Sequence, residues 1–128
     1  MITQIDKTAL NAKVRAFAHA YPGIAAAYLF GSAATGKMSH ASDLDIALMC
    51  SGHIDGFERI TMETALSNLM GRDVDLVIFH QAGVLLQHQI LKYGCLIYEQ
   101  HPAERVRQET ISRSRYLDTR HLYKRLAV

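Results

Sequence analysis

The stretch Asp43-Leu44-Asp45-Ile46-Ala47-Leu48-Met49 constrains the fold of this chain more than any other part of its sequence. Apolar residues at every second position, beginning with Leu44, are typical of a β-strand with one buried face. Side chains two residues apart in a strand point the same way, so Asp43 and Asp45 project together from the opposite face. The stretch therefore predicts a half-buried strand that holds two carboxylates only a few ångströms apart.

The residues from Asp73 to Phe79 repeat this alternation and place two more aspartates, Asp73 and Asp75, on one face of a second strand. Around these strands, apolar spacing and the Gly and Pro positions predict a helix over residues 3–20, a strand over 24–30, a short helix and loop over 31–42, helices over 54–70 and 82–93, a strand over 95–98 and a helix over about 102–126. This order predicts an α/β (α+β) fold, in which helices pack on a small mixed β-sheet.

Length and composition are those of one globular domain, which we expect to span residues 1–128. The chain is 49% hydrophobic and 20% charged, which argues against disorder. Its longest apolar run, Ile24 to Phe30, is far shorter than the roughly 18 residues that cross a membrane. The N-terminal stretch carries charges where a signal peptide is apolar, and Cys50 and Cys95 form no disulfide motif. These features predict a cytoplasmic protein with two buried, free thiols.

Charge is distributed unevenly along the chain. The formal net charge is +2, yet residues 1–103 sum to −2 and residues 104–128, with seven basic against three acidic side chains, sum to +4. A basic C-terminal helix on an acidic body favours contact with an anionic partner, although a solvated basic helix is an equally good interpretation. We expect the apolar side chains of this helix to pack against the protein instead of recognising nucleic acid: Tyr116, Leu117, Leu122 and Tyr123.

The aspartate pairs indicate a metal site. Two like charges held this close raise each other's pKa unless a cation neutralises them, and hard carboxylate oxygens suit Mg²⁺ or Mn²⁺. If the two strands are neighbours, Asp73 or Asp75 completes a three-carboxylate site with Asp43 and Asp45. Such a site can hold two metal ions about 4 Å apart for in-line phosphoryl or nucleotidyl transfer. The alternative is that both pairs only decorate solvent-facing strand edges.

A Gly-Ser turn, Gly31-Ser32, follows one predicted strand and opens a predicted short helix. This position offers backbone N–H groups and a hydroxyl to a phosphate, although it is also the place of an ordinary helix N-cap. The segment from Gly31 to Met38 comes close to the P-loop pattern GxxxxGK[ST]. We reject a P-loop, because Met38 replaces the hydroxyl residue that holds Mg²⁺ and the next strand leaves no room for the long helix that should follow.

These segments together resemble the signature of a minimal nucleotidyltransferase of the DNA polymerase β superfamily: Gly31-Ser32, Ser42-Asp43-Leu44-Asp45 and Asp73-Val74-Asp75-Leu76-Val77. That signature is a Gly-Ser pair, a connecting loop, a DxD pair and a third Asp on a later strand. The resemblance covers roughly residues 20–98. The elements that follow, with the basic tail, resemble the MNT antitoxin branch, whose partner is a HEPN-domain toxin.

The resemblance implies a polymerase-β-like fold and a role for each signature residue. Asp43, Asp45 and Asp75 would ligate two Mg²⁺ ions, with Mn²⁺ as a substitute, and Asp75 would also help to activate the acceptor hydroxyl. It assigns binding of the ATP phosphates to the turn and the loop: Gly31, Ser32 and Ser42. The implied protein adenylyltransferase moves AMP from ATP to a tyrosine hydroxyl of the HEPN ribonuclease toxin and so acts as its antitoxin.

One position departs from the signature, because Thr35 stands where many relatives carry an Arg. Two alternatives to toxin adenylylation stay open, and this departure motivates the first of them. One is a non-catalytic antitoxin that neutralises its toxin by occlusion. The other is nucleotidyl transfer to RNA or a small molecule, for which the basic tail would supply phosphate contacts. We expect a hetero-oligomer with the toxin and no membrane association, and nucleic acid is the less favoured partner.

Overall fold

Strands and helices alternate along residues 6–35 and 43–126, the residues that the computed structural model describes. The four strands lie in the order β3 (Val74–Ile78), β2 (Leu44–Cys50), β1 (Ile24–Phe30) and β4 (Cys95–Glu99). β2 and β3 run parallel, whereas β1 is antiparallel to both β2 and β4. The prediction of an α/β fold with a small mixed sheet is therefore confirmed.

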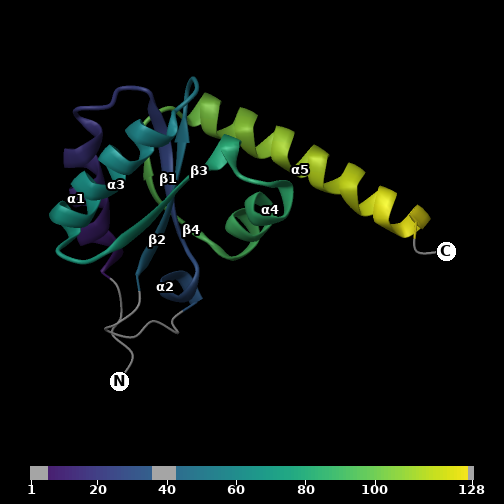
Figure 1. Ribbon diagram of the computed structural model, residues 1–128, viewed down its shortest axis with the longest axis horizontal. Coiled ribbons are helices and arrows are strands. Elements are labelled where there is room, and N and C mark those ends of the chain that lie inside the picture. Colours follow the sequence, from purple (N-terminus) through teal and green to yellow (C-terminus); the bar gives the residue numbers. More distant parts are fainter. Residues whose placement is uncertain (1–5, 36–42, 127–128) are drawn as a thin grey trace.

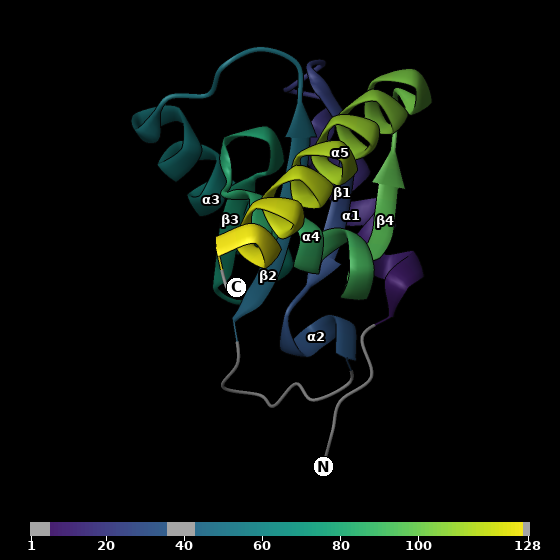
Figure 2. The same ribbon diagram turned by 90° about the vertical axis from the view of Figure 1, so that its right-hand side faces the viewer.

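Helices cover both faces of this sheet (Figures 1 and 2). α1 (Lys7–Ala18) and α3 (Gly56–Met70) lie on one face, and α4 (Val84–Tyr93) and α5 (Pro102–Leu126) lie on the other. A short helix, α2 (Ser32–Thr35), follows β1, and a 3-10 turn over Phe79–Gln81 follows β3. That turn was not predicted: it takes up Phe79, which we expected at the end of the strand, and α4 begins two residues later than expected, after its N-cap residue Gly83.

The apolar face predicted for residues 43–49 packs against α1 and α3. The buried side chains come from both layers: Val14 and Phe17 of α1, Leu44, Ile46 and Leu48 of β2, and Met62 and Leu66 of α3. Asp55 caps α3 by accepting a hydrogen bond from the backbone N–H of Glu58 (2.7 Å), and Gly71 follows the helix with a left-handed φ of 72°. These signals are local in the sequence, which is why this layer was predictable.

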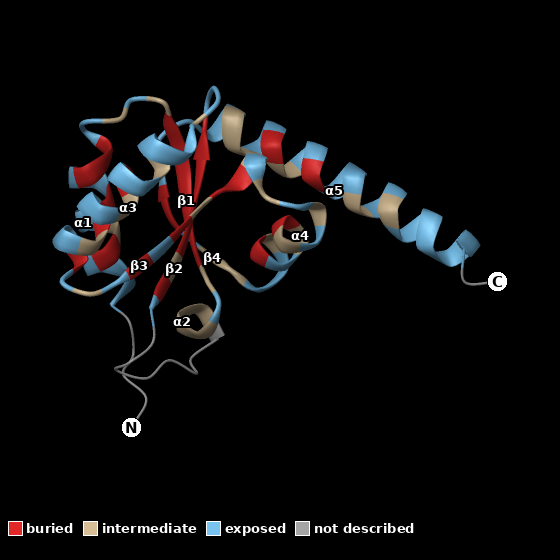
Figure 3. Cartoon of the chain, viewed as in Figure 1, coloured by how far each residue is buried: buried red, intermediate tan, exposed pale blue. Residues whose placement is uncertain are grey.

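The opposite face of β2 is buried as well, so the prediction of a half-buried strand is wrong. Ala47 and Met49 are fully buried there, in a second cluster with Phe79 and with Ile90 of α4 (Figure 3). The strands contribute small residues to this cluster, such as Ala26 of β1, beside the larger Tyr28 and Met49. An alanine in an alternating pattern does not reveal whether a helix covers it.

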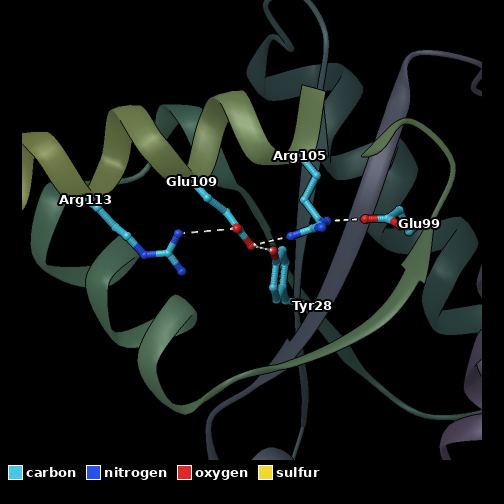
Figure 4. Close-up of polar contacts among 5 residues, drawn as sticks. All are labelled: Tyr28, Glu99, Arg105, Glu109 and Arg113. Carbon is cyan, nitrogen blue, oxygen red and sulfur yellow. Dashed lines mark hydrogen bonds and ion pairs between the residues drawn. The ribbon is translucent and has the colours of Figure 1, made fainter. Parts of the chain in front are cut away.

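The first half of α5 is anchored to the sheet by a polar network (Figure 4). The hydroxyl of Tyr28 on β1 donates a hydrogen bond to Glu109 on α5. Arg105 pairs with Glu99 at the end of β4 and lies 3.0 Å from Glu109. Arg113 approaches the other oxygen of Glu109 at 3.4 Å. The network therefore links α5 to both β1 and β4.

The second half of α5 projects past α4 and is largely exposed (Figures 1 and 3). The exposed fractions are 57% for Leu117, 57% for Leu122 and 62% for Tyr123, so the prediction that these side chains pack against the protein is wrong. Tyr116 is half-buried, and its ring stacks on that of His88 in α4, with centroids 3.6 Å apart. The sheet is too short to offer a surface to all of this helix.

The two cysteines differ in environment. Cys50 is buried at the end of β2, and burial raises the pKa of its thiol to about 12. Cys95 is only half-buried, so the prediction of two buried thiols is wrong for this residue. Within the described ranges, no helix is long and apolar enough to cross a membrane.

Candidate active site

Asp45 and Asp75 lie side by side because β2 and β3 are neighbouring parallel strands. The two residues are register partners, one position after the pair formed by Leu44 and Val74. Neighbouring strands lie about 4.8 Å apart, so both carboxylates leave the same face of the sheet close together. The sequence left open whether these two strands are adjacent, and the structure places them in one ladder.

Gly31 brings the main chain against the carboxylate of Asp45. It follows Phe30, the last residue of β1, which is the register partner of Asp45 on the other side of β2. A Cβ atom at Gly31 would lie 2.2 Å from Oδ2 of Asp45, and the φ of Gly31 is +69°, where side chains are disfavoured. Both the close approach and the backbone conformation therefore require glycine here.

The ionised form of Asp45 is disfavoured in this environment. The residue is half-buried, and burial raises the pKa of its carboxyl group above the usual range. The negative charges of Asp75 and Asp43 raise that pKa further. The same face of β2 continues into buried Ala47, so Asp45 stands at the border between the core and the open end of the sheet. A bound cation would relieve the repulsion among these carboxylates.

The other two aspartates flank the strands. Asp43 is exposed and immediately precedes β2. Asp73 precedes β3, and its carbonyl oxygen accepts a hydrogen bond from the N–H of Leu44 (2.9 Å). Within the described residues, no three His, Cys, Asp or Glu side chains are grouped closely enough to hold a metal ion. The donor chemistry nevertheless fits a hard divalent cation, because two carboxylates adjoin and the charge of Asp43 acts on Asp45.

Side chains of α3 satisfy the outer edge of β3, next to Asp75. The N–H of Leu76 donates to the carboxylate of Glu63 (2.9 Å), and the carbonyl of Leu76 accepts from Arg59 (3.2 Å). Arg59 and Glu63 also pair with each other at 3.1 Å. Because β3 is an edge strand, these bonds replace those of a missing neighbouring strand and hold Asp75 in register.

Sequence reasoning missed Arg59 and Glu63. Their opposite charges at i, i+4 spacing in a predicted helix were a usable signal for a side-chain pair, but not for its place beside β3. A cavity of about 390 Å³ opens along this edge and is lined by Arg59, Asp75 and Gln81, among others. The outer edge of β3 therefore offers a cavity and the guanidinium group of Arg59 beside Asp75.

The predicted phosphate-binding residues are only partly described. Ser32 is half-buried and begins α2 directly after Gly31. α2 has only 4 residues, so any contribution of a helix dipole there is small. Ser42, the third predicted nucleotide-binding residue, lies outside the described residues, as does the end of the rejected P-loop segment around Met38.

The family model of the polymerase β nucleotidyltransferases matches residues 12–103, a segment that contains all four strands and both aspartate pairs. The chain belongs to this family. The polymerase-β-like fold predicted for the nucleotidyltransferase is therefore confirmed. α5 lies almost wholly beyond the matched segment.

Relatives of this chain include the protein adenylyltransferase MntA of Shewanella oneidensis, with 33% identity over 73 residues. That alignment covers 57% of this chain and 52% of MntA, so the chain spans about half the length of this curated relative. One similar solved structure is a toxin-antitoxin with AMP-PNP, with a TM-score of 0.79, 23% identity and coverage of 91% of this chain and 94% of that chain.

Another similar structure is a tri-AMPylated Shewanella oneidensis HEPN toxin in complex with MNT antitoxin. Its TM-score is 0.76 at 20% identity, and the match covers 95% of this chain and 96% of that chain. At these identities, the two structural matches establish a shared fold.

Proposed function

We propose that this chain is a Mg²⁺-dependent adenylyltransferase that transfers AMP from ATP to a tyrosine hydroxyl of a cognate HEPN ribonuclease toxin, and so acts as an antitoxin. The observation that supports this proposal most is the placement of Asp45 beside Asp75, against the main chain at Gly31. Family membership, the similarity to MntA and the fold shared with the antitoxin of an AMPylated toxin favour AMP as the transferred group.

The carboxylates of Asp43, Asp45 and Asp75 would hold the metal ions. When bound, Mg²⁺ or Mn²⁺ supplies Lewis-acid stabilisation of the charge on the transferred phosphoryl group. The aspartates suit this task, because burial and the charges of Asp75 and Asp43 all disfavour the ionised form of Asp45, and a cation would compensate for them.

The remaining residues would bind ATP and handle the acceptor proton. The turn at Gly31-Ser32 would offer main-chain N–H groups to a phosphate, and Ser32 and Ser42 would add hydroxyl donors to the β- and γ-phosphates. The acceptor oxygen then forms a bond to the α-phosphorus as the bond from that phosphorus to the pyrophosphate oxygen breaks. Asp75 would take the proton of the acceptor hydroxyl and pass it to solvent, since Asp75 is more exposed than Asp45.

A transfer assay with ATP labelled at different phosphates tests this function. We expect the cognate toxin to acquire label from α-labelled ATP with Mg²⁺, but none from γ-labelled ATP and none after chelation of the metal. Asp45→Asn and Asp75→Asn should abolish the label. Asp73→Asn is the matched control, because Asp73 is the neighbouring aspartate that precedes β3, and this variant should retain the label. Label from γ-labelled ATP, or full activity of Asp45→Asn, would contradict the proposal.

A second function is favoured by the exposed second half of α5. A chain that masks its toxin by contact alone needs such a surface but not the aspartates. Neutralisation of the toxin in cells separates the two functions. If Asp45→Asn is expressed at the normal level and still protects as well as the unchanged chain, occlusion is the function.

A further inference from the structure

The second half of α5 is a helix with little protein to support it. The buried residues of α5, Gln108 and Ser112, lie in its first half, and no described residue after Ser112 is buried. Figure 3 shows this part exposed and projecting beyond α4. A helical segment as short as residues 113–126 is marginal in water without tertiary contacts. A surface that covers this segment would therefore stabilise it.

Two adjoining cavities lie along this half of α5 on the side that faces α4. The first, of about 370 Å³, is lined by Leu91 of α4 and Leu117 of α5. The second, of about 390 Å³, is lined by Leu85 of α4 and Tyr123 of α5, and Tyr116 lines both. We call the surface that these five residues form the α4–α5 groove, together with the basic residues that line the same cavities: Lys92, Arg113, Arg120 and Lys124. Leu85 is 57% exposed and Tyr123 is 62% exposed, so the groove presents apolar surface to solvent.

The rim of the groove is basic. Lys92, Arg113, Arg120 and Lys124 line the two cavities, and no described Asp or Glu does. Arg113 pairs with Glu109 at 3.4 Å. Arg120 and Lys124 make no ion pair or hydrogen bond with any residue in the part of the chain that the structure describes. These two cations are therefore available to carboxylates of another molecule.

Charge and ring stacking decide between the candidate occupants. A second copy would bring the same basic helix, and residues 104–128 carry a formal charge of +4 in each copy, so groove-to-groove pairing meets repulsion. Single-stranded nucleic acid needs free aromatic faces for its bases, but one face of Tyr116 is already occupied by His88, parallel to within 2°. An apolar protein segment with acidic flanks satisfies both the apolar floor and the unpaired cations.

We propose that the α4–α5 groove docks an apolar segment of the protein partner that is flanked by Asp or Glu side chains. The partner is the toxin of the proposed function, on which this inference rests. The groove is built from α4 and α5, whereas the aspartate pair lies on β2 and β3, so docking and AMP transfer use separate side chains. Binding can therefore be weakened without altering the nucleotide site.

Calorimetric titration of the purified cognate HEPN toxin tests the docking site. We expect Arg120→Glu to weaken binding at least about tenfold, because it places a carboxylate among acidic partner groups. The matched control is Arg125→Glu, which changes the net charge equally but lies about 140° away around the helix. This control should bind within about threefold of the unchanged chain, as an exposed charge away from an interface does. Tyr123→Ser should also weaken binding, because it removes the apolar contact.

Two further measurements keep this test separate from the test of AMP transfer. Arg120→Glu should bind AMP-PNP with Mg²⁺ as the unchanged chain does, which shows an intact nucleotide site. Amide hydrogen exchange in residues 113–126 should slow when the toxin is added. If the toxin accepts AMP and binds Arg120→Glu as tightly as the unchanged chain, the groove is wrong and the proposed function stands. If the toxin neither binds nor accepts AMP, the proposed function fails.

Other occupants would also overturn the inference. Sedimentation velocity of the chain alone would reveal a dimer that Arg120→Glu dissociates, in which case the occupant is a second copy. Retention of RNA that depends on Arg120 and Tyr123 and falls steeply with salt would identify nucleic acid instead.

Discussion

At the scale of single residues, Gly31 and Asp45 constrain each other. The left-handed main chain at Gly31 (φ +69°) and the clash that an added Cβ atom would make with Oδ2 of Asp45 are two independent reasons for glycine. Gly52 helps to separate these two reasons. Its φ is also left-handed, at +83°, but nothing lies within 4 Å of the place that its Cβ atom would take. The two glycines therefore share a conformation and differ in whether a carboxylate is nearby.

Gly31→Ala should lose nucleotide binding, whereas Gly52→Ala should keep it. Both substitutions place a side chain in the left-handed region, which costs about 1–2 kcal/mol. Only Gly31→Ala also drives Asp45 from its position, so we expect it to be the less stable of the two. Urea unfolding and AMP-PNP titration measure these effects. Equal nucleotide affinity in the two variants would show that the approach of Gly31 to Asp45 has no part in the site.

Asp45→Asn should stabilise the metal-free protein at neutral pH. Folding raises the pKa of Asp45, so ionisation of this carboxyl opposes folding at pH values above that pKa, and the penalty disappears as the pH falls and the group is protonated. We expect the melting temperature of the variant in chelator to exceed that of the unchanged chain at pH 7.5. The difference should shrink on acidification. A variant that melts lower at pH 7.5 would contradict the electrostatic account of this residue.

At the scale of elements, the attachment of α5 depends on one tyrosine. Tyr28 is buried in β1, and its hydroxyl donates to Glu109 (Figure 4). Burial raises the pKa of Tyr28, and the charge of Glu109 raises it further, which keeps the phenol protonated. Burial alone would raise the pKa of Glu109, but the hydrogen bonds from Tyr28 and Arg105 outweigh it and lower that pKa. The pair thus favours an ionised carboxylate.

Tyr28→Phe should destabilise the protein by about 1–3 kcal/mol at pH 7, because the lost hydrogen bond has a charged acceptor. Since the folded protein lowers the pKa of Glu109, the stability that this carboxylate contributes is present above the usual Glu pKa and is lost as the pH falls below it. The effect of the substitution should therefore shrink in urea unfolding at pH 3.5. Tyr98→Phe is the matched control, because the hydroxyl of Tyr98 donates to the neutral side chain of Gln100 (2.9 Å). A Tyr28→Phe effect that equals this control at both pH values would contradict the role of Glu109.

The elements that sequence reasoning predicted are those with local signals. Alternation predicted the strands that carry Asp45 and Asp75, and apolar spacing with the positions of glycine and proline predicted the helices around them. The register between Asp45 and Asp75 depends on strands separated by α3, so it needed the structure. The burial of Ala47 and the exposure of the end of α5 were not predictable either, because burial of a small or amphipathic side chain depends on which distant element reaches it.

At the scale of the whole molecule, the aspartates of the candidate site and the excess of positive charge lie on different elements. The adjacent aspartates lie at the start of β2 and β3, near α2, and the basic side chains of residues 104–128 lie on α5 (Figure 1). This separation suits a protein that binds a metal–nucleotide complex at one place and an acidic partner at another. It also lets each site be tested without the other.

Calorimetric titration of AMP-PNP into the chain alone tests the central claim most directly, because it needs no partner. We predict binding in Mg²⁺ that is lost on chelation, and that falls at least about tenfold in Asp45→Asn and Asp75→Asn, since each removes a negative charge and one carboxylate oxygen from the metal site. Asp73→Asn should bind as the unchanged chain does. Unaltered affinity in Asp45→Asn and Asp75→Asn, or an equal loss in Asp73→Asn, would contradict a nucleotide site built on the register pair of β2 and β3.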